Sequence, residues 1–216
     1  PPTLTELYAV SPFLAILQQG FTAVRGTPGL NPERNLQFDV GVEAEFEQFR
    51  GSLHGFQAFV FDYITYLPRH RQDVSVGDAI NVAFANTDLA TLTGGELAVE
   101  WDATAWLTPF ASLNYVQGQD KTRDTRGSLP PPDPPAGQEE PLPGIAPLDS
   151  RIGLRWHSTT ESPRWWIELA ARVVARQSRV ASSLLERETS GFTTYDLRTV
   201  WKPEPGIQFV AGIENM

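Results

Sequence analysis

The 216-residue chain contains no cysteine, and it has no uninterrupted run of eighteen apolar residues. Without cysteine, neither a disulfide framework nor a thiolate metal site can form. Without a long apolar run, the sequence holds no candidate for a membrane-spanning helix. Basic residues are also scarce, since 17 Lys and Arg stand against 26 Asp and Glu, for a formal net charge of -9. Because no basic stripe is present to neutralise phosphates, we expect no nucleic-acid partner.

Alternation of apolar and polar residues is the clearest pattern that the sequence does contain. In the stretch 36–49 (LQFDVGVEAEFEQF), apolar residues alternate with residues that are mostly acidic. Successive side chains of a β-strand point to opposite faces, so this stretch predicts a strand with one apolar face and one acidic face. A mean hydropathy of -0.25 is compatible with a membrane location, because only every second residue of a membrane-barrel strand faces lipid.

The same alternation predicts about eight strands, whose connections alternate in length. Short connections are expected at 48–51, 103–106, 158–164 and 202–206, and long ones at 68–79, 119–147 and 177–191. Up-and-down outer-membrane barrels have this order, with tight periplasmic turns and long extracellular loops. The proline-rich stretch within 119–147 favours a solvated surface loop, with a polyproline ligand for a recognition domain as the alternative.

Aromatic and charged residues are sorted in the way that a membrane barrel requires. All six tryptophans lie beside the short connections: Trp101, Trp106, Trp156, Trp165, Trp166 and Trp201. Indole rings prefer the membrane-water boundary, so this grouping predicts an aromatic girdle at one interface. The charged residues within strands lie on the non-apolar face. Since an Arg at the lipid midplane costs roughly 2 to 4 kcal/mol, that face is expected to line a wet lumen.

These patterns together predict an all-β fold, an antiparallel up-and-down transmembrane β-barrel that is present as a partial, open barrel. We assign residues 36–216 to the partial barrel and residues 1–35 to an extracellular loop segment. A short helix is expected near the start of that segment, because Thr3 and Glu6 have the spacing of a capping box.

The sequence shows no catalytic constellation, and we expect neither an enzyme, a metal site nor a cofactor. Motifs such as G-x-S-x-G, H-E-x-x-H and the phosphate loop are absent. The histidines are scattered, with no carboxylate at metal-ligand spacing: His54, His70 and His157. Ligand contacts are expected from the three long loops and the upper lumen. The electrostatic candidates there are Arg172, Arg176 and Arg198.

Several short motifs resemble the β-barrel of TonB-dependent outer-membrane receptors. Residues 30–33 (LNPE) followed by 38–41 (FDVG) are similar to the family's "L-x-PE…E-x-G" strand start, with Asp39 where Glu is usual. Asn86 with Gly95 and Glu96 is similar to the "N…G-x-E" strand, although Gly94 stands before it. Further matches are 2–8 (PTLTELY), 191–198 (GFTTYDLR) and 212–215 (GIEN).

The resemblance implies that the chain is the C-terminal part of a larger barrel that lacks its final strand here. It implies an outer-membrane location and an N-terminal plug domain that lies outside this chain. It further implies energy-driven import of a scarce small-molecule ligand such as a siderophore, another metal complex, cobalamin or a glycan. The implied partners are the lipid bilayer, the plug, a TonB-type energy-coupling protein and that ligand. The chain begins Pro1-Pro2-Thr3, so we expect a piece of a longer protein.

Two other functions are compatible with the residues. One is a soluble secreted β-sheet binding module, in which the apolar faces would pack on a second sheet. The other is a different outer-membrane porin or channel.

Overall fold

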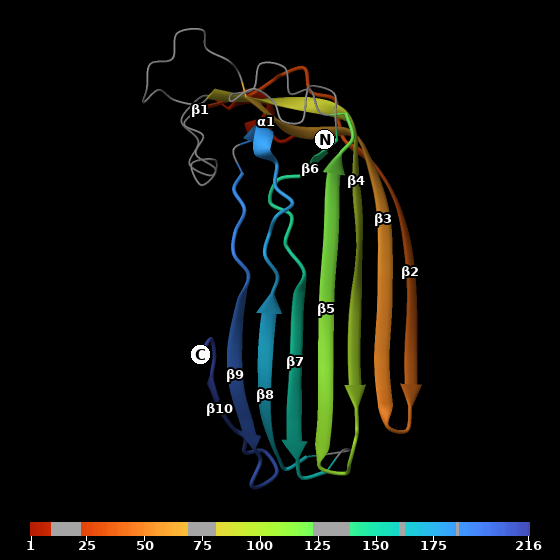
Figure 1. The fold of residues 1–216 in the computed structure, drawn as a ribbon, viewed down its shortest axis with the longest axis vertical. Coiled ribbons are helices and arrows are strands. Elements are labelled where there is room, and N and C mark those ends of the chain that lie inside the picture. The colour runs from red at the N-terminus through yellow and green to blue at the C-terminus, as the bar shows by residue number, and fades with distance from the viewer. Residues whose placement is uncertain (10–22, 69–80, 123–138, 160–162, 185) are drawn as a thin grey trace.

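Long strands run side by side in one curved sheet that does not close on itself (Figure 1). The computed structural model describes residues 1–9, 23–68, 81–122, 139–159, 163–184 and 186–216. The helical elements are α1 (Leu4–Tyr8) and the 3-10 turn η2 (Ser182–Leu184). The strands are β1 (Ala23–Arg25), β2 (Arg34–Phe46), β3 (Phe49–Pro68), β4 (Asn81–Trp101), β5 (Leu107–Asp120), β6 (Glu140–Pro141), β7 (Asp149–His157), β8 (Trp165–Val174), β9 (Phe192–Trp201) and β10 (Phe209–Ile213).

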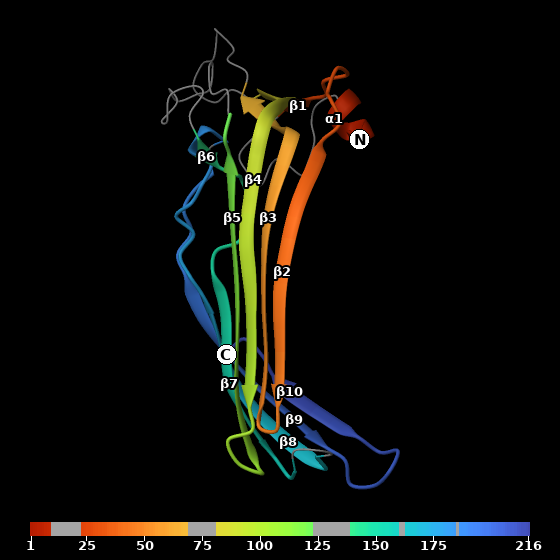
Figure 2. The same cartoon turned by 90° about the vertical axis from the view of Figure 1, so that its right-hand side faces the viewer.

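Eight of the ten strands form a simple up-and-down path. Their order is β10-β9-β8-β7-β5-β4-β3-β2, and every neighbouring pair is antiparallel. Seen from the side, the sheet curves from β2 through β5 towards β9 (Figure 2). The short strands β1 and β6 lie off this path and pair with β4 and β5. The predicted all-β, antiparallel, partial barrel is therefore confirmed, with the strand number that the alternation indicated.

The register brings the apolar residues of successive strands onto one face. At the short-turn end, Phe46 lies opposite Phe49, which lies opposite Trp101 on β4. Further up, Leu154 pairs with Leu169, and Leu169 with Leu197. We call this face the outward row, and its side chains are exposed: Phe38, Val40, Val42, Leu53, Leu97, Ile152, Ile167, Ile213 and others. In the described residues, no second sheet covers the outward row, so the packing that a soluble β-sheet binding module would need is not seen there.

The turn between β2 and β3 differs in position from the prediction. The sequence pattern put it at 48–51, whereas the strands meet at Phe46 and Phe49 with only Glu47 and Gln48 between them. Aromatic residues on both sides of the turn explain the difference. Phe46 and Phe49 pair across the strands with ring centroids 6.4 Å apart, which extends the ladder to a two-residue connection.

The strand β3 carries aromatic residues on both of its sides, and its register shows which side faces outward. Phe59 lies opposite Leu36 and therefore belongs to the outward row. Phe56 lies on the other face, opposite Gly94. A Cβ at Gly94 would lie 2.5 Å from the Phe56 ring, so the glycine provides the space that this ring fills.

The two longest strands, β3 and β4, continue beyond the barrel wall and fold across its loop end. β2 stops pairing at Arg34 and Phe61, and the next residue of β3, Asp62, has a positive φ of 55°. From that point β3 pairs only with β4, and this upper part lies across the top of the sheet (Figure 1).

A small hydrophobic core holds this upper part in place. We call it the loop-end core, and its buried members are Leu30, Val82, Phe84, Ala181 and Leu184. Helix α1 adds Leu7 to its edge, and the predicted capping box is present, because Thr3 Oγ1 accepts from Glu6 N and Glu6 Oε2 accepts from Thr3 N. In the described residues, no helix has the length and apolar character needed to cross a membrane.

Candidate functional site

The inner face of the sheet carries a chain of ion pairs across five strands. Arg155 on β7 lies 3.2 Å from Glu100 on β4 and 2.9 Å from Glu168 on β8. Arg151 lies 3.0 Å from the other oxygen of Glu168 and 3.7 Å from Asp196 on β9. These five residues form the inner ion-pair chain, in which each charged side chain has a partner of opposite sign.

The chain of ion pairs continues to the short-turn end of the sheet. Arg50 on β3 lies 3.3 Å from Glu100 and 2.8 Å from Asp102, the residue that follows β4. Thr108 donates a 2.6 Å hydrogen bond to Asp102. The Arg50 guanidinium lowers the pKa of the Asp102 carboxyl, and the hydrogen bond from Thr108 adds to this effect against the opposing cost of burial. Asp102 is therefore held in its charged form.

One aromatic ring fills the gap that the inner ion-pair chain leaves at β5. The ring of Phe110 lies under two guanidinium groups, 5.2 Å from that of Arg155 and 5.8 Å from that of Arg151. Gly153 lies directly opposite Phe110 on β7, and the ring takes the space in which a Cβ would lie. Cation-π contact thus holds both arginines in place between their carboxylate partners.

The motif residues that introduce β2 have a structural role at the loop end. Asn86 on β4 donates to Asn31 O at 3.1 Å and to Asp62 O at 2.6 Å, and its Oδ1 accepts from Asn31 N at 2.8 Å. Glu33 accepts from Ile64 N at 2.9 Å. These hydrogen bonds satisfy the backbone where β3 leaves β2, which explains why these residue types occur there.

The three arginines expected to contact ligand are separated, and each has a carboxylate partner. Arg172 on β8 is bonded to Asp149 on β7, with Nε 3.0 Å from Oδ2. Arg176 follows β8 and pairs with Glu188 of the β8–β9 connection. Arg198 on β9 lies 2.6 Å from Glu214. Arg172 and Arg176 lie towards the loop end, whereas Arg198 lies deeper, opposite Glu168. Their role in ligand binding stays a prediction.

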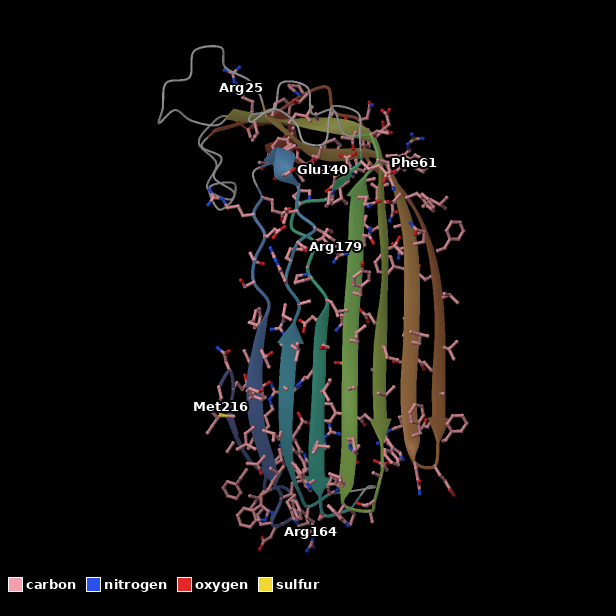
Figure 3. All side chains as sticks on the ribbon, in the orientation of Figure 1. Arg25, Phe61, Glu140, Arg164, Arg179 and Met216 are labelled. Carbon is pink, nitrogen blue, oxygen red and sulfur yellow. The ribbon has the colours of Figure 1, made fainter. Side chains whose placement is uncertain are left out.

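A buried carboxylate that sequence patterns did not single out connects two of the long loops. Glu140 is 1% exposed, and it accepts hydrogen bonds from Ser183 N at 2.7 Å and Ser183 Oγ at 2.6 Å. Glu140, labelled in Figure 3, belongs to β6 within the proline-rich connection, most of which lies outside the described residues. Ser183 belongs to η2. A carboxylate after a proline run gives no local signal of such a contact, because its partner is 43 residues away.

Two of the histidines have partners that account for them. His157 is buried, with Nε2 2.9 Å from Thr108 Oγ1 and Nδ1 2.7 Å from Thr159 O. His54 lies on the inner face, 3.7 Å from Glu43. His70 and most of the expected long connection 68–79 lie outside the described residues. Among the residues that the structure describes, no group of three or more His, Cys, Asp or Glu could hold a metal ion.

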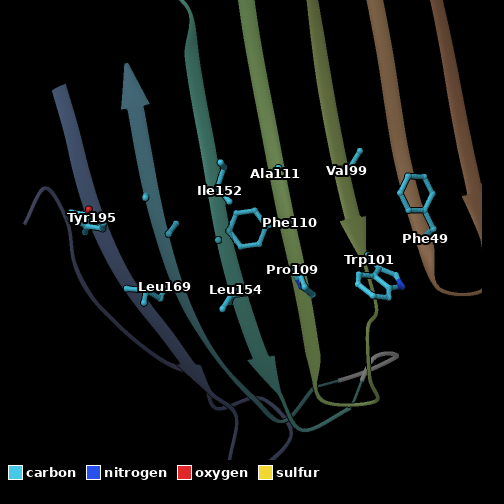
Figure 4. A pocket seen from close by; sticks show the side chains of 13 residues that line it. Phe49, Val99, Trp101, Pro109, Phe110, Ala111, Ile152, Leu154, Leu169 and Tyr195 are labelled. Carbon is cyan, nitrogen blue, oxygen red and sulfur yellow. The ribbon is translucent and has the colours of Figure 1, made fainter. Parts of the chain in front are cut away.

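The outward row contains a hollow of about 510 Å³ near the short-turn end (Figure 4). Small side chains such as Ala111 and Ala171 lie beside larger ones, among them Leu169 and Tyr195. We call this hollow the outer groove.

The tryptophans lie at the short-turn end of the sheet, as their positions beside the short connections predict. Trp166 differs from the expected girdle, because it lies opposite His157 and therefore belongs to the inner face.

Comparison with known proteins shows which protein family has this sheet. The family model described as "TonB dependent receptor-like, beta-barrel" matches residues 1–216. No curated protein sequence matches the chain.

Solved structures with the same fold include three transport proteins. A copper transporter, OprC, aligns with a TM-score of 0.73 and 21% identity over 100% of this chain and 29% of its own. The FrpB iron transporter from Neisseria meningitidis (F3-3 variant) aligns with a TM-score of 0.58 and 17% identity, over 89% of this chain and 28% of its own. A mutant of the ferric enterobactin receptor PfeA from Pseudomonas aeruginosa aligns with a TM-score of 0.57 and 17% identity, over 92% of this chain and 28% of its own. The chain thus spans less than a third of each of these proteins.

Proposed function

The chain belongs to the TonB-dependent receptor β-barrel family, and we propose that the whole protein is an active-transport receptor that imports a scarce ligand. Its location is the outer membrane, which agrees with the exposed outward row. The inner face then looks into the barrel, where the ion pairs remain beside water and protein rather than lipid.

The partners of the whole protein are part of the same proposal. The family implies a plug domain, a TonB-type energy-coupling protein and a small-molecule ligand. The chain itself shows none of these. Self-neutralised pairs such as Arg155 with Glu168 suit a wall along which a plug rests, because they leave few uncompensated charges for the plug to neutralise.

The observation that carries the proposal is the position of the upper β3–β4 segment. Strands of about 9 to 11 residues suffice to cross a bilayer, whereas β3 has 20 residues and β4 has 21. The additional residues of β3 and β4 fold over the loop end. There, Val82 and Phe84 share a buried cluster with Leu184 of the β8–β9 connection. A covered loop end favours a gated receptor over the alternative of a freely open porin.

For the ligand, we propose an anionic metal complex such as a ferric siderophore. Arg172 and Arg176 support this choice because their guanidinium groups are half exposed or more, at the loop end of β8, where a ligand would arrive. An anionic ligand could then take over some of the hydrogen bonds that Asp149 and Glu188 now accept. The structural neighbours are a copper transporter, an iron transporter and a ferric enterobactin receptor, which supports a metal-containing ligand.

Uptake by the full-length protein tests both parts of the proposal. The protein is expressed in cells that lack their own receptors, and uptake of radiolabelled copper, ferric siderophores, cobalamin and oligosaccharides is followed with and without the energy-coupling protein. We expect accumulation of a metal complex only when energy coupling is intact. Energy-independent passage of all small solutes would establish the porin alternative instead.

The arginine assignment is tested by the double variant Arg172→Gln/Arg176→Gln. We expect the affinity for the imported complex to fall by roughly tenfold or more, since each arginine contributes a charge-assisted hydrogen bond. Arg187→Gln, at an exposed arginine of the β8–β9 connection, is the matched control and should bind normally. Unchanged affinity in the double variant would remove these arginines from the binding site.

A further inference from the structure

A hollow of about 430 Å³ lies among the connections at the short-turn end, beside the first residue of β8 and the last residue of β9. Its charged lining residues are Arg164, Lys202 and Glu204. None of these three forms an ion pair with another residue in the part of the chain that the structure describes, whereas the inner-face arginines all do. We call this hollow the basal hollow, and Figure 3 shows Arg164 at that end.

Aromatic rings of the outward row stand directly above the basal hollow. Trp165 on β8 lies opposite Trp201 on β9, which lies opposite Phe209 on β10. The rings of Trp201 and Phe209 stack with centroids 5.5 Å apart. Because indole rings prefer the level of the lipid headgroups and ester groups, this row marks the membrane boundary, and the basal hollow lies at headgroup depth.

The outer groove lies mainly over β4, β5 and β7, and its edge reaches β8 and β9 above the basal hollow, at the depth of acyl chains. Leu169 on β8 and Tyr195 on β9 line it. From Arg164 to Leu169 the strand rises over five residues, which is about 17 Å along its axis. With the tilt of barrel strands this gives a height of about 12 Å, within the ~15 Å thickness of one leaflet of the hydrocarbon core.

We propose that the basal hollow and the outer groove together form a binding site for one aminophospholipid of the phosphatidylethanolamine type. The phosphate lies between Arg164 and Lys202, and the primary ammonium pairs with Glu204. One acyl chain passes Trp165 and Trp201 and enters the outer groove.

The charges of the basal hollow select this headgroup over its alternatives. Two cations and one carboxylate match a headgroup that carries one phosphate and one ammonium. A glycerol headgroup would leave Glu204 without a cation, and a quaternary ammonium cannot donate a hydrogen bond to it. The binding site is separate from the inner face, so the inference does not depend on which ligand is transported.

Lipid retention by the full-length protein tests the inference. The protein is purified in a mild detergent and incubated with mixed micelles that contain phosphatidylethanolamine, phosphatidylglycerol or phosphatidylcholine with the same acyl chains, and bound lipid is counted by native mass spectrometry. We expect one phosphatidylethanolamine to be retained in preference to the other two lipids. Equal retention of all three, or preference for phosphatidylglycerol, would overturn the proposal.

Three variants separate the parts of the site. In Arg164→Gln/Lys202→Gln the retention of phosphatidylethanolamine should fall by roughly thirtyfold, from the usual contribution of two basic side chains near a lipid surface. In Glu204→Gln the preference over phosphatidylcholine should disappear while phosphate binding remains. In Ala171→Leu the groove is partly filled without any change of charge, and retention should again fall.

The control is Arg25→Gln/Arg187→Gln, which removes two exposed charges at the loop end and should retain lipid as the unmodified protein does. Migration of the unboiled protein on electrophoresis checks that each barrel is folded. Unchanged lipid retention in folded Arg164→Gln/Lys202→Gln protein would refute the site. So would a mass spectrum in which a second copy of the protein, rather than lipid, is retained by the unmodified protein and lost in Ala171→Leu.

Discussion

At the scale of single residues, the inner face is built from close fits that leave little freedom for substitution. Phe56 occupies the space beside Gly94, and Phe110 occupies the space beside Gly153. In both cases a large ring lies opposite a glycine on the neighbouring strand. These pairs place aromatic rings against the wall of the barrel without displacing the backbone, so we expect the glycines to be required for stability.

Gly94→Ala is expected to destabilise the folded barrel by about 1 to 3 kcal/mol, the usual cost of overpacking. Its new Cβ would meet the Phe56 ring at 2.5 Å and Tyr115 O at 2.7 Å, and the backbone oxygen cannot move away easily. Gly29→Ala is the control, because nothing lies within 4 Å of the added atom. Denaturant unfolding of the full-length protein in detergent measures both, and equal stability of the two variants would contradict the prediction.

Glu168→Gln tests the centre of the inner ion-pair chain. Glu168 is 5% exposed and accepts from both Arg151 and Arg155, so the variant leaves two guanidinium groups without their shared anion. We expect a loss of about 1 to 3 kcal/mol in unfolding free energy. Glu188→Gln removes the partner of Arg176 at an exposed pair and should cost less than about 1 kcal/mol. A larger loss of unfolding free energy in Glu188→Gln than in Glu168→Gln would show that burial does not determine how much these ion pairs contribute to stability.

At the scale of elements, the sheet has two parts that are stabilised in different ways. The wall from β2 to β10 is held by backbone ladders and cross-strand pairs. The upper β3–β4 segment depends instead on the loop-end core, on hydrogen bonds that Asn86 donates and on the one that Glu33 accepts from Ile64 N. With fewer ladders to support it, the upper segment is expected to open before the wall does.

Leu184→Ala is expected to loosen the upper segment without unfolding the wall. Leu184 is 1% exposed in the loop-end core, and such a truncation costs about 2 kcal/mol or more. Hydrogen exchange at 82–87 should therefore accelerate, while exchange in β7 and β8 stays unchanged. Leu4→Ala, at a residue that is 78% exposed, should change neither region. Faster hydrogen exchange throughout the wall in Leu184→Ala would instead show that the loop-end core and the wall unfold as one cooperative unit.

At the scale of the whole molecule, the sheet is open, and its path ends at β2 and β10. Among the described residues, β2 pairs only with β3 and β10 only with β9, so the outer side of each presents backbone donors and acceptors without a ladder partner. The outward row adds exposed apolar side chains such as Val40, which is 73% exposed. Both features favour edge-to-edge association when nothing pairs with the edges.

The 216-residue chain expressed alone is therefore expected to aggregate, even after refolding in detergent. Light scattering of the refolded chain, with the refolded full-length protein as control, measures this. A monodisperse, β-rich monomer would show that the edges are protected by some rearrangement of β2 or β10.

Much of this architecture follows from local patterns. Side chains alternate with a period of two, so a single chain reveals which residues share a face, and the length of each connection shows the order of turns and loops. For these reasons the sheet, its eight-strand path and the position of the tryptophans could be predicted. The facing of β3 could not, because aromatic residues occupy both of its sides and only pairing with Gly94 and Leu36 separates them.

Contacts between segments that are distant in the sequence depend on the register and curvature of the whole sheet. Arg155 on β7 reaches Glu100 on β4 across the intervening strand β5. Leu184 and Val82 belong to one buried cluster because the upper β3–β4 segment folds across the loop end. Neither contact has a signature in the residues around it. Alternation depends on neighbours one or two positions away, whereas these contacts depend on how strand register and curvature bring residues together across the sheet.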